Sequence, residues 1–373
     1  MFRPTIRERR ARTPALQRAT AAAAALCLCV ACGFEPGPAP LEFSLSGATQ
    51  SALEDAPAVR DQIARELTTL FGTPSQPAYA PHPAWDAAGV DLNQPDASAG
   101  APYPGLAAAA ETYRRECLHC HGVEGGGDGP SAFGLTPAPR DVRLGIFKYT
   151  ALKDQSRPRR ADILHTLEQG IAGTSMPNFQ RLAPAVRESL ADYVRYLAIR
   201  GEVESALVLT WREEEELSPE AVGEALTFVW SRWAKAPSKL VVYEGEVPAA
   251  SKERIARGDA LFHDPLKGNC ASCHGTSGAG DGPAAWKIGV DGQREPAYSD
   301  AWGRPIRPRD LREGLFHGGS RPIDIYRRIY AGIPGGPMPA LGETMKDGEP
   351  LLSSEEMWCL VHYVRSLSLR EGP

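Results

Sequence analysis

The chain has 373 residues, with 41 lysines and arginines against 46 aspartates and glutamates, so its formal net charge is -5. This charge excludes a strongly basic nucleic-acid-binding protein, and the composition, 42% hydrophobic and 23% charged, excludes a protein built of membrane-spanning helices. Eight cysteines form a group at 27–32, two pairs and one isolated residue, which is not the spacing of a disulfide-stabilised domain.

Residues 1–31 are predicted to be a signal peptide. Six arginines precede an apolar run from Ala19 to Ala31, which is too short to span a bilayer. The run leads into Val-Ala-Cys-Gly at Cys32, which resembles a bacterial lipoprotein processing site, although Cys29 stands where such sites usually have leucine. We expect a lipid on Cys32 that anchors the chain to a membrane, and cleavage after Ala31 with release is the alternative.

Residues 32–104 are predicted to be an arm rich in proline and alanine. One helix is expected from Pro57 to Phe71, where apolar residues recur at helical spacing and Gly72 follows as a stop signal. The stretch 73–104 is expected to be a tether or an extended arm. Loss of residues 1–31 would remove six arginines and one glutamate, which leaves the mature chain with a net charge of -10.

Two segments, 105–201 and 251–373, are predicted to be copies of one domain. The same short motifs recur in them in the same order. They are Cys-x-x-Cys-His-Gly at 117–122 and 270–275, Gly-Asp-Gly-Pro at 127–130 and 280–283, Pro-Arg-Asp at 139–141 and 308–310, Met-Pro at 176–177 and 338–339, and Tyr-Val-Arg at 193–195 and 363–365. Between the copies, residues 202–250 carry ten acidic and four basic residues, and are predicted to be an acidic connector with a helix that begins at Pro219.

Each copy contains Cys-x-x-Cys-His, the spacing that attaches c-type haem. Two thiols add across the two vinyl groups of one porphyrin, and the adjacent histidine becomes the proximal iron ligand. The attachment residues are Cys117, Cys120 and His121 in the first copy, and Cys270, Cys273 and His274 in the second. A thioredoxin-like pair would not place a histidine after both motifs, and a four-cysteine zinc site would not be divided between two complete copies.

Met176 and Met338 are the candidate sixth ligands of the two irons. Each lies before a proline and after a glycine-containing turn, at the same place in the repeat. His/Met ligation raises the redox potential and suits an electron carrier, whereas a five-coordinate haem binds gases or peroxide. Competing ligands in the second copy, for which we expect structural roles, are Met345, Met357, His317 and His362.

Together these motifs resemble class I cytochrome c in a di-haem arrangement. The resemblance covers both copies, more than half of the chain, and implies a mainly α fold with two tandem cytochrome c domains. In that family the helix that carries the cysteine pair packs across the last helix of the domain. The matching segments are Leu106–Arg115 with Pro184–Ile199, and Ser251–Phe262 with Ser354–Leu367.

The resemblance also implies contacts around each haem. Pro130 and Pro283, nine residues after the proximal histidines, match the place of a proline whose carbonyl accepts the histidine Nδ1–H. Arg140 and Arg309 are candidate partners of the haem propionates, because a guanidinium group matches a carboxylate. The equal alternative for these arginines is an internal Arg–Asp pair that fixes the loop.

Three further features are open to more than one interpretation. An insertion of 16 residues in the second copy, with Trp302 among its aromatic residues, either covers the second haem or contacts a partner. The basic residues at 157–160 are expected to form a solvated surface, with docking of an acidic partner as the alternative. Cys359 is expected to be a buried free thiol.

The sequence therefore predicts a c-type cytochrome with two covalently bound haem c groups and no catalytic residues. We expect it to transfer electrons on the periplasmic side of a membrane. We expect it to act in a respiratory chain as a subunit or docked carrier of a larger oxidoreductase, so its partners would be redox proteins and a membrane, and no nucleic acid. The alternative is a di-haem enzyme such as a peroxidase, which needs an open or histidine-ligated second haem.

Overall fold

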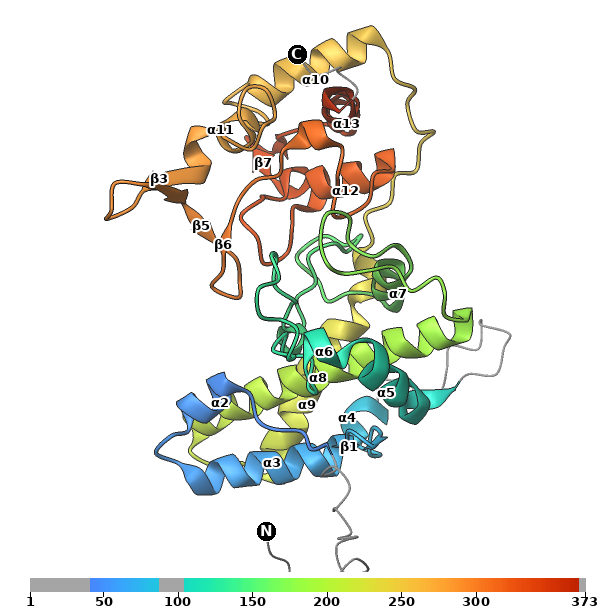
Figure 1. Cartoon of the computed structure of the whole chain (residues 1–373), viewed down its shortest axis with the longest axis vertical. Coiled ribbons are helices and arrows are strands. Elements are labelled where there is room, and N and C mark those ends of the chain that lie inside the picture. The colour runs from blue at the N-terminus through green and yellow to red at the C-terminus, as the bar shows by residue number, and fades with distance from the viewer. Residues whose placement is uncertain (1–40, 87–103, 369–373) are drawn as a thin grey trace, which may run out of the picture. The chain divides into compact units, whose positions relative to one another are not determined.

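The computed structural model describes residues 41–86 and 104–368 (Figure 1). The predicted signal peptide and Cys32 lie outside the described residues, and so do residues 87–103 of the arm. The described residues belong to one compact unit. Within the described ranges, no helix combines the length and the apolar character that a bilayer-spanning segment needs.

The described residues are mainly helical, as predicted. The helices are α2 (Gly47–Ala52), α3 (Pro57–Phe71), α4 (Pro83–Asp86), α5 (Gly105–Glu116), α6 (Leu118–His121), α7 (Arg160–Gln169), α8 (Pro184–Glu214), α9 (Pro219–Ala234), α10 (Lys252–His263), α11 (Ala271–His274), α12 (Pro322–Ala331) and α13 (Ser354–Leu367). Short antiparallel pairs join β1 (Gly72–Thr73) to β2 (Gln76–Pro77), β3 (Trp286–Ile288) to β4 (Arg294–Pro296), β5 (Tyr298–Ser299) to β6 (Pro305–Ile306), and β7 (Met345–Lys346) to β8 (Glu349–Pro350).

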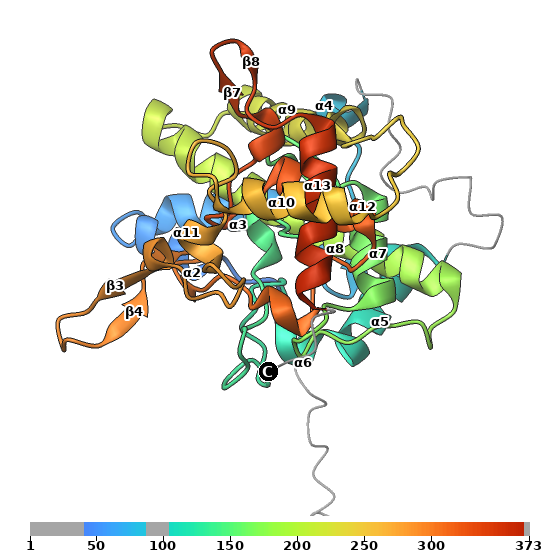
Figure 2. The ribbon, with the colours of Figure 1, turned by 90° about the horizontal axis from the view of Figure 1, so that it is seen from above.

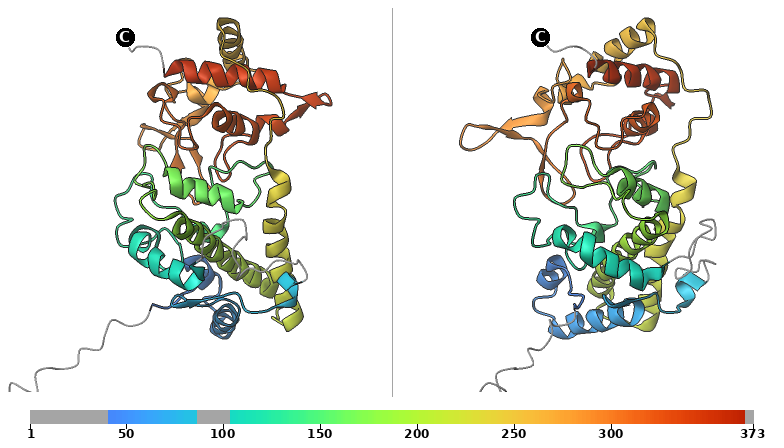
Figure 3. Two further views of the ribbon diagram at one scale, coloured as in Figure 1. Left: turned by 90° about the vertical axis from the view of Figure 1, so that its right-hand side faces the viewer. Right: turned by 45° about the vertical axis from the view of Figure 1, so that its right-hand side comes forward.

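The first hydrophobic core is built around the long helix α8. Helix α5 packs against it, as expected, and the rings of Tyr113 and Tyr193 meet with their centroids 5.1 Å apart. Helix α3 lies against another part of α8 (Figures 1 and 3), and the hydroxyl of Tyr196 donates to the carbonyl of Phe71 at 2.5 Å. The arm therefore belongs to the first core.

The arm matches the prediction at α3 but not after it. Helix α3 has the predicted bounds, and Gly72 ends it with a φ of 72°. The next residues form the β1–β2 pair, and Tyr79 is buried against Phe71 and Tyr196. The expected tether is therefore wrong for these residues, because an aromatic side chain holds them to the core.

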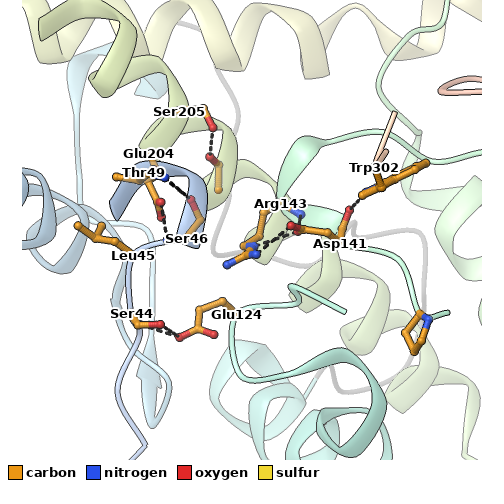
Figure 4. Close-up of polar contacts among 12 residues, drawn as sticks. Ser44, Leu45, Ser46, Thr49, Glu124, Asp141, Arg143, Glu204, Ser205 and Trp302 are labelled. Carbon is orange, nitrogen blue, oxygen red and sulfur yellow. Dashed lines mark hydrogen bonds and ion pairs between the residues drawn. The ribbon is translucent and has the colours of Figure 1, made fainter. Parts of the chain in front are cut away.

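The start of the arm is tied to two buried carboxylates of the first core. The hydroxyl of Ser44 donates to Glu124, in the loop after α6, at 2.9 Å. The backbone N–H of Ser46 donates to Glu204 of α8 at 2.7 Å (Figure 4). These bonds join the first described residues to the loop that follows the first Cys-x-x-Cys-His motif and to α8.

Helix α8 runs through the predicted domain boundary after residue 201. Gly201 lies inside the helix. A glycine is needed at this position because a Cβ would lie 2.3 Å from the Cβ of Arg143. Glu202, one residue further, accepts hydrogen bonds from Arg157 Nε at 2.8 Å and from Trp233 Nε1 at 2.7 Å. The connector therefore packs into the first core, and α9 begins at Pro219 as predicted.

The basic residues at 157–160 do not form the expected solvated surface. Arg157 is only 7% exposed and pairs with Glu202, which contradicts both the solvated surface and the docking alternative. Arg159 pairs with Asp162 at 3.0 Å, and Arg160 is also held by carboxylates of the first domain. The positive charges of this segment are thus matched inside the molecule.

The second core forms where α10 crosses α13 (Figure 2), which is the expected helix pair. The rings of Phe262 and Tyr363 meet there with centroids 5.2 Å apart, the counterpart of the tyrosine pair in the first core. A Cβ on Gly258 would lie 2.1 Å from the carbonyl oxygen of Cys359, so only glycine allows the helices to approach this closely. Cys359 is a buried free thiol, as expected, and burial raises its pKa.

Two candidate haem sites

One turn of helix presents each Cys-x-x-Cys-His motif. In the first copy, the N–H groups of Cys120 and His121 both donate to the carbonyl of Cys117, at 3.1 and 2.9 Å. The second copy repeats this turn, with Cys273 and His274 donating to Cys270 at 3.2 and 2.8 Å. Residues three and four positions apart share one helix face, so each turn places two thiols and an imidazole on the same side.

The Gly-Asp-Gly-Pro motif closes the loop that follows each turn. The N–H of Gly127 donates to the carbonyl of His121 at 2.9 Å, and Gly280 donates to His274 at 2.8 Å. A Cβ on Gly122 would lie 2.1 Å from an oxygen of Asp128, and the same clash recurs between Gly275 and Asp281 at 1.9 Å. The two loops therefore share one conformation, which the duplicated glycines and aspartates determine.

The donor groups of both sites suit covalent haem. Among the described residues the four thiols are unpaired, so no disulfide competes for them there. Burial raises the pKa of Cys117 and of Cys270 to about 12. Burial also lowers the pKa of His121 and His274, and a neutral imidazole is the form that binds a metal.

The backbone beside the proximal histidines differs from the expectation. Pro130 and Pro283 are both exposed, and Pro283 begins a short 3-10 helix (Pro283–Ala285). The carbonyl of Arg140 faces the ring of His121. The carbonyl of Arg309 faces His274, but Nδ1 of His274 is buried and has no hydrogen-bond partner of ordinary length among the described residues. The Gly-Asp-Gly-Pro loop lies on the carbonyls of the helical turn, and the Pro-Arg-Asp segment reaches the ring instead.

Met176 and Met338 are presented by matching turns. The carbonyl of Met176 accepts from the N–H of Ile171 at 3.1 Å, and that of Met338 accepts from Ile333 at 3.2 Å. Both side chains are partly buried, and that of Met176 packs against the first core. The two candidate ligands thus occupy equivalent positions, and their ligation of iron stays a prediction.

The competing ligands of the second copy are engaged elsewhere or exposed. Met345 is 58% exposed on β7, while Met357 is buried in the second core. Nε2 of His362 lies 2.9 Å from the carbonyl oxygen of Pro248. His317 lies with Nδ1 2.9 Å from the hydroxyl of Tyr149. Structural roles for these four residues stay a prediction.

The arginines of the Pro-Arg-Asp motifs do not pair with the aspartates beside them. Arg140 forms a salt bridge of 2.6 Å with Asp300 of the second copy, and Arg309 donates to the carbonyl of Leu315 at 3.3 Å. Asp141 instead pairs with Arg143 at 2.8 Å (Figure 4). Pairing of Arg140 and Arg309 with propionates stays a prediction. The contact of Arg140 with Asp300 was not foreseen, because 160 residues separate them.

Two family profiles match the two copies separately. The one described as "Cytochrome C oxidase, cbb3-type, subunit III" matches residues 104–194, and the one described as "Cytochrome c" matches residues 255–368. No curated protein matches the chain.

A solved chain is similar in structure. It belongs to the "reducing HAO-like protein complex Kustc0457/Kustc0458" of Kuenenia stuttgartiensis. The TM-score is 0.51 at 28% sequence identity, and the alignment covers 69% of this chain and 94% of that one. With the duplicated geometry of the sites, these matches show that the chain is a c-type cytochrome with two haem-binding domains, each of which holds one covalently bound haem c.

Proposed function

We propose that this cytochrome transfers electrons in a respiratory chain, on the periplasmic side of a membrane, as a subunit or docked carrier of a larger oxidoreductase. The observation that carries the electron-transfer role is the pair of matching turns that present Met176 and Met338. Met176 and Met338 would each hold an iron together with the histidine of the same domain, and such His/Met ligation would raise the potential of the haem, which favours electron transfer over substrate binding.

The residues of each site hold and tune the bound haem, which supplies one-electron chemistry between Fe(II) and Fe(III). The two thiols fix the porphyrin covalently, and the buried histidine stays neutral and ready to bind iron. Packed aromatic pairs, such as Tyr113 with Tyr193, hold the flanking helices rigid. A rigid site changes little between oxidation states, which suits rapid electron transfer.

The proposal that the chain works in a larger assembly has two supports. The similar solved chain is part of a named protein complex. Helices α3 and α9 extend the first core beyond what a haem domain of the predicted bounds 105–201 would contain, and a freely diffusing carrier has no need of them. On the outer faces of α8 and α9, Leu209 and Phe228 are 57% and 59% exposed.

Substitution of the methionines tests the electron-transfer role against the peroxidase alternative. The oxidised wild type should show the weak absorption band at the red end of the visible spectrum that reports a sulfur–iron bond. Met176→Ala and Met338→Ala should each remove part of this band, and the double variant should remove all of it. Met345→Ala is the control, because this methionine is exposed, and should keep the band unchanged.

Two outcomes would count against the proposal. If the double variant keeps the full band, the methionines are not the ligands. If the reduced wild-type protein turns over peroxide rapidly, an iron has an open position and the enzyme alternative replaces electron transfer.

A further inference from the structure

A hairpin of the second domain lies against the Pro-Arg-Asp loop of the first. It is formed by β5 and β6 within the inserted stretch. Nε1 of Trp302 donates to the carbonyl of Asp141 at 2.9 Å (Figure 4). Arg304 donates to the carbonyl of Pro139 at 2.8 Å. The hairpin therefore bonds to the backbone on both sides of Arg140, the residue whose carbonyl faces His121.

Asp300, at the turn of the hairpin, brings a buried negative charge to the first domain. Its carboxylate accepts from Arg140 at 2.6 Å and from Lys148 at 2.9 Å. The side chains of Asp300 and Lys148 are only 2% and 3% exposed. The guanidinium of Arg140 and the ammonium of Lys148 lie 5.0 and 5.3 Å from the centroid of the Trp302 ring. Charges act over longer distances in such a site than in water, because the local dielectric constant is low.

The same hairpin also touches the turn that presents the second candidate axial ligand. The N–H of Ala301 donates to the carbonyl of Gly335 at 2.9 Å, three residues before Met338. A Cβ on Gly335 would lie 2.9 Å from Ile146 and 3.2 Å from the Trp302 ring, so the turn and the hairpin are in close contact. One short segment thus contacts the proximal side of the first site and the axial-ligand turn of the second.

We propose that the β5–β6 hairpin completes the first haem site from the second domain, with Asp300 and Trp302 as positioning residues that set the potential of the first haem. The proposal rests on both domains carrying haem. The fixed charge of Asp300 favours the more positive Fe(III) state and lowers the potential. Trp302 holds the loop whose Arg140 carbonyl faces His121.

The test is a spectroelectrochemical titration of the full-length holoprotein and four single variants. Asp300→Asn removes the buried charge, and Trp302→Phe removes the hydrogen bond to Asp141. Asp291→Asn and Trp286→Phe are matched controls on the other hairpin of the same insertion. Asp291 is exposed there. The Trp286 ring stacks with Arg294 at 4.6 Å, and its Nε1 donates to Gly280 at 3.3 Å, all within the second domain. The titration is repeated in a Met338→Ala background. This substitution removes the candidate ligand of the second iron, so the transition that keeps its potential belongs to the first haem.

We expect Asp300→Asn to raise the potential of the first haem and Trp302→Phe to shift it, while both controls leave it at the wild-type value. Amide hydrogen exchange of residues 138–145 should speed up in Trp302→Phe and not in Trp286→Phe. If the first haem keeps its potential in Asp300→Asn and Trp302→Phe while two haem transitions are seen, the hairpin proposal is wrong and the di-haem function stands. If the wild type takes up fewer than two electrons per chain, the function itself is wrong.

Discussion

Helices α10 and α13 lie very close together at Gly258. We expect that a methyl group added at this residue would push the two helices apart. Gly258→Ala would place a Cβ 2.1 Å from the backbone carbonyl of Cys359, which cannot rotate away. We expect a loss of about 1–3 kcal/mol in the free energy of unfolding, as for other overpacked cores. Gly47→Ala is the control, since a Cβ there meets no atom within 4 Å. Denaturant unfolding of the holoprotein measures both, and an equal effect of the two substitutions would contradict this account.

His317 is expected to make stability depend on pH. Burial, with the positive charges of Arg309, Lys148 and Arg140, lowers its pKa to about 4, whereas an unfolded histidine has a pKa of about 6.5. Between these values the unfolded chain binds the extra proton. The stabilisation is therefore complete above pH 6.5 and is lost as the pH falls towards 4, by at most about 1.4 kcal/mol per pH unit.

The measurement for His317 is the unfolding free energy from pH 7 to pH 4. His317→Gln keeps a polar group near the hydroxyl of Tyr149 and cannot take up the proton. We expect a flatter pH profile in this variant than in the wild type. Identical profiles would show that His317 is not buried as described.

At the scale of elements, α8 is held by the carboxylate of Glu202. Arg157, Arg232 and Trp233 donate to it at distances between 2.5 and 3.1 Å. Glu202→Ala would leave the buried guanidinium of Arg157 without its counter-charge, and breaking such a pair costs about 3–5 kcal/mol. Glu213→Ala, at an exposed position of the same helix, should stay within about 0.5 kcal/mol of the wild type. Thermal or denaturant unfolding that shows similar losses for both would contradict the role of Glu202.

The ends of a helix could be predicted where residues next to them in the sequence determine them. They could not be predicted where packing against distant residues determines them. Pro57 and Gly72 predict where α3 begins and ends, and the structure has the helix begin at Pro57 and end before Gly72. Gly201 looks like the same kind of stop signal, but α8 continues through it. The glycine is there because Arg143 packs against the helix at that point. A sequence pattern cannot distinguish a glycine that ends a helix from one that allows another side chain to pack closely against the helix.

At the scale of the whole molecule, the two haem-attachment motifs could be recognised in the sequence, and the contacts between the copies could not. The attachment motif lies within five consecutive residues, so the spacing alone carries the chemistry. The salt bridge from Arg140 to Asp300 joins residues 160 positions apart, and no periodic pattern links them. For the same reason the inserted hairpin could be noticed as an insertion, while its contact with Asp141 needed the structure.

Anchoring to a membrane also belongs to this scale. We propose that a lipid on Cys32 anchors the chain. The residues between Cys32 and residue 41 would then keep the first domain within about 30 Å of the bilayer surface. Cys32→Ser should move the protein from the membrane fraction to the soluble fraction, and Cys29→Ser, inside the predicted signal peptide, should leave it in the membrane fraction. Mass spectrometry of the mature N-terminus should detect the lipid, and membrane retention of Cys32→Ser would contradict the anchor.

The central claim is that one chain holds two His/Met haem centres that exchange single electrons. A spectroelectrochemical titration of the wild-type holoprotein tests it most directly. We predict two one-electron haem transitions and an oxidised spectrum in which both centres contribute to the sulfur–iron band. Uptake of fewer than two electrons per chain, or an oxidised spectrum of five-coordinate iron in either centre, would contradict the account.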